Sequence, residues 1–416
     1  MPSCSIVHAA AMATDIELKR HVFRRLTFGP HPGDMDRVAA YSPDELVTEL
    51  LAAPPLAVSP PELGSDDDYG RVTQWWVDLL RSTEAGLHER MVWFWHGHLT
   101  SGIQKAAPSL MVRQNLLIRE HALGNFRTLL QQITIDAAML GWLDGDGSTV
   151  ENPNENHARE LMELFTLGHG SGYTEQDVHY GAIALAGWWV DDEAADSVVF
   201  DDSISQRSVP FLGGRVTTAT DVIDAVCNHP ALAPHIAGRM YWAFHGTEPA
   251  DDVRNELATI FLDSGLEIQP LVEAIVRHPT FLDNTLNRPK TGLEWYISLC
   301  NLYGTSPDWS PLEALGHVPF NPPNVAGWPG HSRWTSVGAE LAKAQIAWDY
   351  VWEVKGPEDS AAGSDLVADL LSRASLDVSS DTRRALDTAY GANPDDWEPF
   401  RIIYALIAMC PEFNLA

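Results

Sequence analysis

Apolar residues recur every three to four positions along most of the chain, which is the spacing of an α-helix with one buried face. In residues 15–28, for example, basic side chains alternate with Leu18, Val22 and Leu26. Helix-start sequences accompany this pattern, such as the capping boxes that begin at Ser42 and at Thr174. The periodicity therefore predicts a mainly α fold, a large helical globule.

A period of two, which is typical of β-strands, is confined to one region. Val198-Val199-Phe200 and Val209-Pro210-Phe211-Leu212 flank polar residues, and we expect at most a small β-hairpin near 198–212. At 416 residues the chain exceeds the usual size of one domain. We expect a single large helical domain over 1–416, with two packed sub-domains at about 14–190 and 216–416 as the alternative.

Charge and cysteine usage narrow the classes of partner. The chain has 27 Lys and Arg against 57 Asp and Glu, a formal net charge of −30. Such a chain repels phosphate backbones and anionic lipid, so we expect no nucleic-acid partner and no membrane partner. The four cysteines follow no CxxC spacing, which argues against a disulfide framework or a thiolate zinc site.

Targeting signals are also missing from the sequence pattern. No apolar run approaches the roughly 20 residues that span a bilayer. Residues 1–13 are weakly apolar and carry no basic stretch, so no signal peptide is predicted, and Met12 is an alternative start. We expect a soluble cytoplasmic protein with reduced thiols.

The most informative stretch is a predicted helix that begins at Asn152, has Pro153 in its first position and stops at Gly168. Glu160 and Glu163 are three residues apart, which places both carboxylates on one face. A strongly apolar face lies beside them. A helix with this composition is either solvated on its charged side or lines a site.

The polar face of this helix has two interpretations. In one, Arg159 pairs with Glu155 or Glu163, and the pairs form a buried salt-bridge network that fixes helix packing. In the other, Glu160, Glu163 and Arg159 take part in catalysis, the carboxylates as metal ligands or as acid and base. Asn156 and Arg159 would then orient the two carboxylates.

His96-Gly97-His98 ends a predicted aromatic helix. Imidazoles two residues apart diverge in mid-helix, but Gly97 permits a turn from which both can face one ion. His96, His98, Glu160 and Glu163 together would suit a divalent transition metal, namely iron, manganese, copper or zinc. The alternative is that both histidines are buried and hydrogen-bonded among Trp side chains.

Tryptophan is frequent, with 15 in the chain. We predict that at least two of three pairs meet around one cavity suited to a planar small molecule: Trp93 and Trp95, Trp188 and Trp189, Trp328 and Trp334. The alternative is that these rings only fill the core.

A long Pro-, Gly- and Asn-rich loop is expected at 306–332, and it carries Asn324, Trp328 and His331. Loops of this length inside compact domains are often functional. We expect it to close a pocket, with a rigid hydrophobic plug as the alternative. The residues expected to bind a cofactor or ligand are Trp93, Trp95, Asn156, Asn324 and Trp328.

Several motifs together resemble the bacterial DUF1800 family, which has no assigned function. They are Arg24 to Gly29, Phe94 to Thr100, Asn154 to Gly168, Tyr173 to Val178 and Pro322 to Gly330. The resemblance implies a mostly helical fold and singles out motif positions: His96, His98, Glu155, Asn156, Arg159, Glu160, Glu163, Asn324 and Trp328. His157 stands where the family pattern has Tyr, which argues against a shared role as a ligand.

Three classes of function remain open. The first is a metal-dependent enzyme, an oxidoreductase, that acts on a small molecule in a Trp-lined pocket. The second is a non-catalytic partner or scaffold protein that binds a co-encoded protein and whose His, Glu and Arg cluster is structural. The third is a metal-independent hydrolase or transferase that uses paired carboxylates.

Overall fold

The computed structural model describes residues 14–64, 68–82, 86–191, 198–201, 207–283, 285–305, 308–354, 365–392 and 399–416. Helices dominate this part of the chain. The first are α1 (Asp15–Leu26), α2 (Asp34–Arg37), α3 (Pro43–Ala52), α4 (Tyr69–Arg81), α5 (Leu87–His98), α6 (Pro108–His121), α7 (Phe126–Thr134), α8 (Ala137–Trp142) and α9 (Glu155–Glu160). The π-helix η1 (Leu161–Thr166) and α10 (Glu175–Leu185) follow.

After four short strands, helices resume and continue to the C-terminus. They are α11 (Ala219–Cys227), α12 (Leu232–His245), α13 (Asp251–Asp263), α14 (Ile268–Val276), α15 (Thr280–Asp283), α16 (Gly292–Tyr303), α17 (Pro311–Leu315), α18 (Val337–Tyr350), α19 (Leu366–Arg373), α20 (Ser380–Ala392), α21 (Pro399–Met409) and α22 (Pro411–Asn414). Two 3-10 turns, η2 (His331–Thr335) and η3 (Val351–Glu353), flank α18. The predicted mainly α fold is confirmed.

The strands are β1 (Trp188–Val190), β2 (Val198–Phe200), β3 (Val209–Phe211) and β4 (Gly214–Val216). The two segments expected to form one hairpin are both strands, but they do not pair with each other. β2 pairs with β1 and β3 pairs with β4, both antiparallel. Leu212 and Gly213 join β3 to β4 with φ angles of 47° and 79°, the positive values that a type I′ turn requires.

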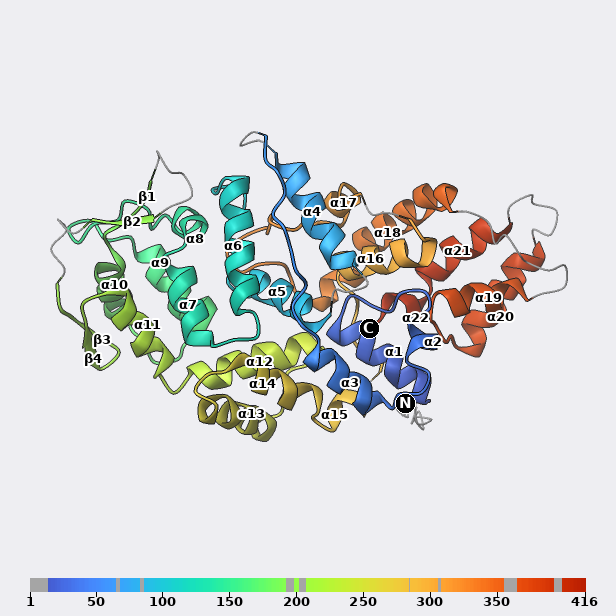
Figure 1. The fold of residues 1–416 in the computed structure, drawn as a ribbon, viewed down its shortest axis with the longest axis horizontal. Coiled ribbons are helices and arrows are strands. Elements are labelled where there is room, and N and C mark those ends of the chain that lie inside the picture. The colour runs from blue at the N-terminus through green and yellow to red at the C-terminus, as the bar shows by residue number, and fades with distance from the viewer. Residues whose placement is uncertain are drawn as a thin grey trace, which may run out of the picture.

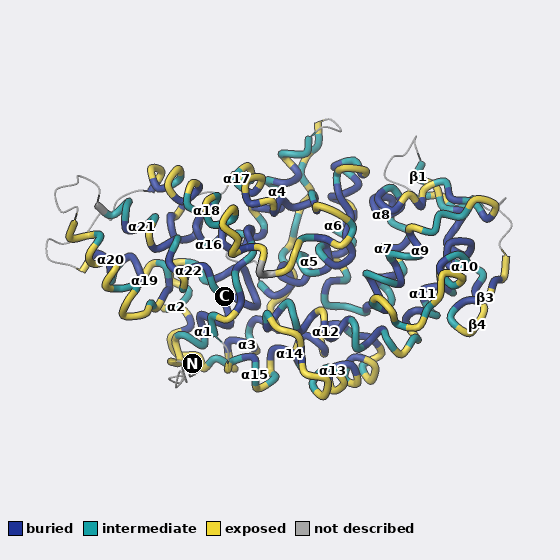
Figure 2. Tube along the Cα trace, turned by 180° about the vertical axis from the view of Figure 1, so that it is seen from behind, coloured by how far each residue is buried: buried dark blue, intermediate teal, exposed yellow. Residues whose placement is uncertain are grey.

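The molecule is elongated, with the strands at one end, α19 and α20 at the other, and α5 and α6 between them (Figure 1). One contiguous apolar core runs through it, from Val22 to Phe413, and Figure 2 shows buried backbone along the middle of the molecule. Helices from the two halves of the sequence pack on each other: α1 on α12, α4 on α16 and α7 on α11. No helix of the described residues is long and apolar enough to cross a membrane.

The helix expected from residue 152 starts later and changes type. Asn154, and not Asn152, is the N-cap, because its side chain accepts a hydrogen bond from the backbone N–H of Asn156. The α-helical part ends at Glu160, and a π-helical turn continues the segment. Gly168 has a φ of 81, the left-handed conformation predicted for the stop.

The loop before α18 lies against the end of α5 and the residues that follow it. The backbone N–H of Ile103 donates to the carbonyl of Phe320, and Gln104 donates to the carbonyl of Pro322. Phe320 has a φ of 63°, which is strained for a bulky residue, and its side chain is fully buried. Burial of the ring offsets this strain, so the loop is fixed to the rest of the structure by a buried side chain as well as by hydrogen bonds.

The C-terminal residues pair with the segment that precedes α16. The backbone N–H of Lys290 donates to the carbonyl of Asn414, and that of Ala416 donates to the carbonyl of Arg288. Pro289 and Leu415 form an antiparallel bridge. This pairing fixes the backbone on both sides of Pro289.

Gly327→Ala is expected to lower the free energy of unfolding by about 1–3 kcal/mol. Gly327 has a φ of 79°, and a Cβ there would lie 2.5 Å from the carbonyl oxygen of Gly97. Gly338→Ala is the matched control, because a Cβ at Gly338 meets no atom within 4 Å. Urea denaturation measures both variants, and equal effects would contradict a close approach of the loop to α5.

Candidate functional site

α5 presents its two motif histidines to different surroundings. The ring of His96 lies among aromatic rings, with centroid distances of 4.9 Å to Trp76, 5.4 Å to Phe320 and 5.6 Å to Trp328. Its Nε2 is buried and has no hydrogen-bond partner among the described residues. Burial lowers the pKa of His96 to about 3, so the ring is neutral.

His98 faces the π-helix. Its Nε2 lies 3.0 Å from the carbonyl oxygen of Phe165, and Nε2 of His235 lies 3.4 Å from the carbonyl oxygen of Leu164. A π-helix shifts the backbone hydrogen-bond pattern, and here imidazoles approach two of its carbonyls. Burial, followed by the charge of Arg239, lowers the pKa of His98 well below its usual value. The ring is therefore neutral, with its proton on Nε2 and a lone pair on Nδ1.

The predicted catalytic carboxylates lie on a half-buried surface. Glu163 accepts a hydrogen bond from Tyr173 and lies 3.0 Å from Nδ1 of His169, whose side chain is exposed. Burial and then the charge of Glu163 raise the pKa of Glu160. Arg159 forms a bidentate pair with Glu175, with distances of 2.9 and 2.8 Å.

The neighbours of this helix therefore differ from the expected ones. The strong partner of Arg159 is Glu175 of α10, and Glu155 is a distant second at 3.8 Å. Asn156 is exposed, and it donates to the carbonyl of Leu143 instead of orienting a carboxylate.

No described group of three or more His, Cys, Asp or Glu side chains is placed so that it could hold a metal ion. His96 lies in an aromatic cluster, His98 contacts a backbone carbonyl, and Glu163 contacts Tyr173 and His169. The metal centre of His96, His98, Glu160 and Glu163 gains no support from this geometry and stays a prediction.

A cavity of about 120 Å³ lies beside His98, and we call it the inner cavity. Three parts of the chain that are distant in sequence line it: α5, α12 and residues between Arg288 and Pro329. Its lining includes Arg90, Trp93, Phe94, Gly97, His98, Arg239, Trp242, Arg288, Thr291, Glu294, His317, Trp328 and Pro329. The inner cavity thus joins the end of the His96-Gly97-His98 motif to the loop motif around Trp328.

Buried ion pairs form one side of the inner cavity. Arg288 binds Glu294 through two hydrogen bonds of 2.9 and 2.8 Å, and Arg90 pairs with the same carboxylate. Burial alone would raise the pKa of Glu294, but the charges of Arg288 and Arg90 hold it well below its usual value. Glu294 is also the N3 residue of α16, in a capping box with Thr291.

His317 adds a second neutral imidazole. Its Nδ1 accepts a hydrogen bond of 3.0 Å from the backbone N–H of Leu293, so the proton is on Nε2. Burial lowers the pKa of His317 to about 3. No described residue makes a hydrogen bond to Nε2, and the ring lines the inner cavity.

Of the six tryptophans in the three predicted pairs, Trp93 and Trp328 line the inner cavity, one from each of two pairs, so no complete pair does. Trp93 and Trp328 stack with centroids 5.1 Å apart, and Trp334 stacks on His317 at 4.5 Å. Trp95 lies in the core instead and donates to the carbonyl of Ala122. Trp188 and Trp189 belong to β1 and do not line the inner cavity.

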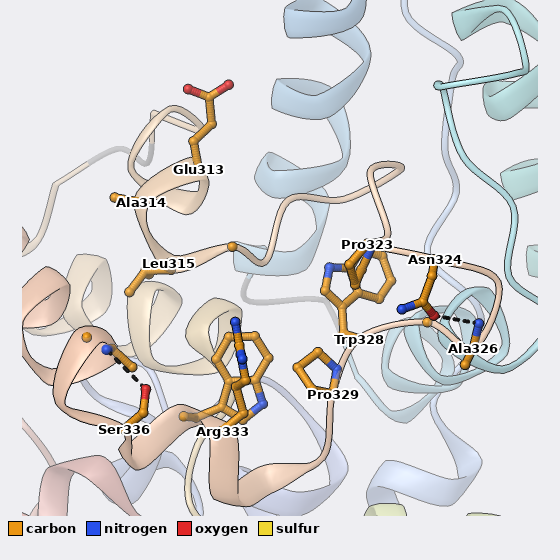
Figure 3. Close-up of a pocket in the computed structure, with 15 residues that line it drawn as sticks. Glu313, Ala314, Leu315, Pro323, Asn324, Ala326, Trp328, Pro329, Arg333 and Ser336 are labelled. Atoms are coloured by element: carbon orange, nitrogen blue, oxygen red, sulfur yellow. Dashed lines mark hydrogen bonds between the residues drawn. The ribbon is translucent and has the colours of Figure 1, made fainter.

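A larger pocket of about 770 Å³ lies on the outer side of the loop, and we call it the outer pocket. Asn324, Trp328, Pro329, Arg333 and Trp334 line it (Figure 3). Trp328 and Pro329 also line the inner cavity. Asn324 accepts a hydrogen bond from the backbone N–H of Ala326, so it braces the loop. The side chain of His331 lies outside the described residues.

Sequence reasoning missed most of the charged lining. Arg90, Arg239, Arg288 and His317 lie outside the motifs or at their edges, and no spacing connects them. The capping-box spacing of Thr291 and Glu294 is visible in the sequence, but it indicates a helix start and not a site.

Comparison with known proteins agrees with the motifs. The family model described as "Protein of unknown function (DUF1800)" matches residues 21–415. The chain belongs to the DUF1800 family. No curated protein and no solved structure matches it. Membership in DUF1800 carries no assigned reaction, so the function has to be argued from the site.

The buried histidines predict that stability falls as the pH decreases from 7.5 to 5.5. Burial lowers the pKa of His96 and His317 to about 3 and that of His157 to about 4. The unfolded chain takes up protons below about pH 6.5 while these rings stay neutral in the fold, so each costs about 1.4 kcal/mol by pH 5.5.

Chemical denaturation at the two pH values measures this loss. His157→Asn is expected to reduce the loss by about the contribution of one histidine. His169→Asn, at an exposed ring, is the control and is expected to leave it unchanged. Equal stability of the wild type at both pH values would contradict the buried neutral state of these rings.

Proposed function

We propose that this protein is an enzyme that binds a small organic molecule in the inner cavity and uses His98 as a proton acceptor. One observation carries the proposal. The ends of two sequence motifs, at His98 and Trp328, meet buried arginines at a single cavity. Packing alone does not favour charged groups beside a cavity, because unfilled space and buried charge both cost free energy.

The imidazole of His98 is held in one orientation, as suits a general base. Its Nε2 is engaged with the carbonyl of Phe165, which fixes the tautomer and leaves the Nδ1 lone pair as the group that can accept a proton. Its ring also stacks on Phe94 at an interplanar angle of 6°. A base held in one orientation avoids reorganisation when a substrate binds.

The aromatic wall suits a planar ligand. The rings of Trp93 and Trp328 stack with an interplanar angle of 28°, and Trp242 lines another part of the cavity. Offset stacking on indole is favourable for aromatic and conjugated molecules. The Nε2–H of His317 is a hydrogen-bond donor to a polar group on such a ligand.

Thermal shift assays with a panel of neutral, cationic and anionic aromatic molecules test the site. We expect at least one compound to raise the Tm in a saturable way and to quench tryptophan fluorescence. Trp328→Ala is expected to weaken binding about ten-fold or more, since stacking and shape are lost. Trp348→Ala is the matched control, because Trp348 is 47% exposed on α18. A panel without any binder, or unchanged binding to Trp328→Ala, would contradict the proposal.

The metal-dependent oxidoreductase remains a second candidate, because His98 lines the cavity and the Nδ1 lone pair of a neutral imidazole can bind a metal ion. That hypothesis expects protein purified without a His tag to contain about one equivalent of metal by mass spectrometry. His96→Ala and His98→Ala should each lose it while helical content by circular dichroism stays constant. Metal-free wild-type protein, or variants that keep the metal, would contradict this candidate.

Two proposals concern the surroundings of the protein. We place it in the cytoplasm, which fits the buried thiols of Cys227, Cys300 and Cys410, none of which forms a disulfide with another described residue. We also propose a protein partner, supported by exposed apolar side chains along and just after α18: Val337, Leu341, Trp348 and Trp352.

A further inference from the structure

We infer that the ligand of the inner cavity carries an anionic group, a carboxylate or a phosphate, which Arg90, Arg288 and Arg239 bind. The inference rests on the proposed function and specifies its substrate class. It is drawn from the charges, the unpartnered donors and the position of these three side chains.

Buried positive charge exceeds buried negative charge beside the inner cavity. Arg90 and Arg288 share the single carboxylate of Glu294. A third guanidinium, that of Arg25, does not line the cavity but interacts electrostatically with Arg288 and Glu294; it is fully buried, and its hydrogen-bond partner is the neutral side chain of Asn287. Buried cations need compensating negative charge. One carboxylate among three guanidiniums leaves room for an anion, in a chain whose overall charge is −30.

Two donors of this arginine pair lack a partner. Nη1 of Arg90 and Nε of Arg288 are buried and have no hydrogen-bond partner among the described residues, and other parts of both side chains line the inner cavity. The side chains are 9% and 1% exposed. Both guanidiniums meet at Oε1 of Glu294, so their free N–H groups lie on neighbouring groups. An oxyanion bound beside the two guanidiniums would reduce the repulsion between the two cations.

Arg239 supplies a positive charge from another element, α12. Its guanidinium lies 5.7 Å from the ring centroid of Trp242, and no carboxylate of the described residues forms an ion pair with it. The residue is exposed although it lines the cavity. Arg239 therefore lies in the solvent-exposed part of the cavity lining, where an anion would enter, and Arg90 and Arg288 lie deeper.

The cavity is partly open to solvent, so its volume limits only the part of the ligand that lies inside it. A volume of about 120 Å³ holds several water molecules or one small organic group, since one water needs roughly 10–15 Å³ by this kind of measure. The indole rings of Trp93, Trp242 and Trp328 in the lining favour a flat body. A small aromatic or conjugated acid combines the flat body with the anionic group.

Matched acid and amide pairs test the charge requirement directly. Benzoate with benzamide and phenylacetate with phenylacetamide differ in charge and hardly in shape, and phenyl phosphate and inorganic phosphate represent the phosphate class. Tm and calorimetric titration are measured at constant ionic strength, so that general salt effects cancel. We expect saturable binding of at least one acid and at least ten-fold weaker binding of its neutral partner.

Arginine variants locate the binding site. Arg239→Gln is expected to weaken acid binding on the order of five- to ten-fold, and Arg90→Gln to abolish it. Arg215→Gln is the matched control, because Arg215 is an exposed arginine in β4, away from the cavity. If Arg90→Gln fails to fold, because Glu294 loses a partner, the exposed Arg239→Gln decides the question.

The outcomes separate this inference from the proposed function. If amides bind as tightly as acids and Trp328→Ala loses both, the anionic group is wrong and the small-molecule site stands. The same conclusion follows if acids bind equally well to Arg239→Gln and Arg90→Gln. If no acid binds, the inference is overturned, and if no neutral probe binds either, the proposed function falls with it.

Discussion

The carboxylate of Glu294 is the interaction on which the centre of this molecule depends. It completes the capping box at the start of α16, accepts hydrogen bonds from Arg288 in the segment before that helix, and pairs with Arg90 of α5. Removing one partner from such a buried group is costly, because the remaining charges stay away from water. The relative positions of α5 and α16, and hence the walls of the inner cavity, follow from this one shared contact.

Local sequence signals predicted most of the fold. The capping boxes at Ser42 and Thr174 form as expected, and Gly168 adopts its left-handed conformation. Strand partners could not be predicted, since β2 pairs with β1 across residues 191–197, whose sequence does not specify a register. The π-helix was not predicted either, because helical spacing alone does not distinguish i+4 from i+5 bonding over one turn.

The sequence predicted only part of the site, for a related reason. Motifs pointed to His98, Trp93 and Trp328, which line the inner cavity. They could not show that His96 turns into an aromatic cluster, because that depends on Phe320 arriving from a distant loop. Arg90 and Arg288 could be recognised as site residues only from their tertiary contact with Glu294, and spacing along the chain does not predict that contact. Residue type and period describe elements, whereas the charge balance of a cavity is set when elements meet.

The backbone pairing of Arg288 and Lys290 with Asn414 and Ala416 has a consequence for biosynthesis. Arg288 lines the inner cavity, yet its strand-like segment has no antiparallel partner until residues 414–416 have emerged from the ribosome. The earlier helices can pack before residues 414–416 emerge, but the cavity reaches its final shape only once these residues have paired. A nascent chain that stalls before residue 414 would therefore carry both motifs and most of the core without a finished binding site.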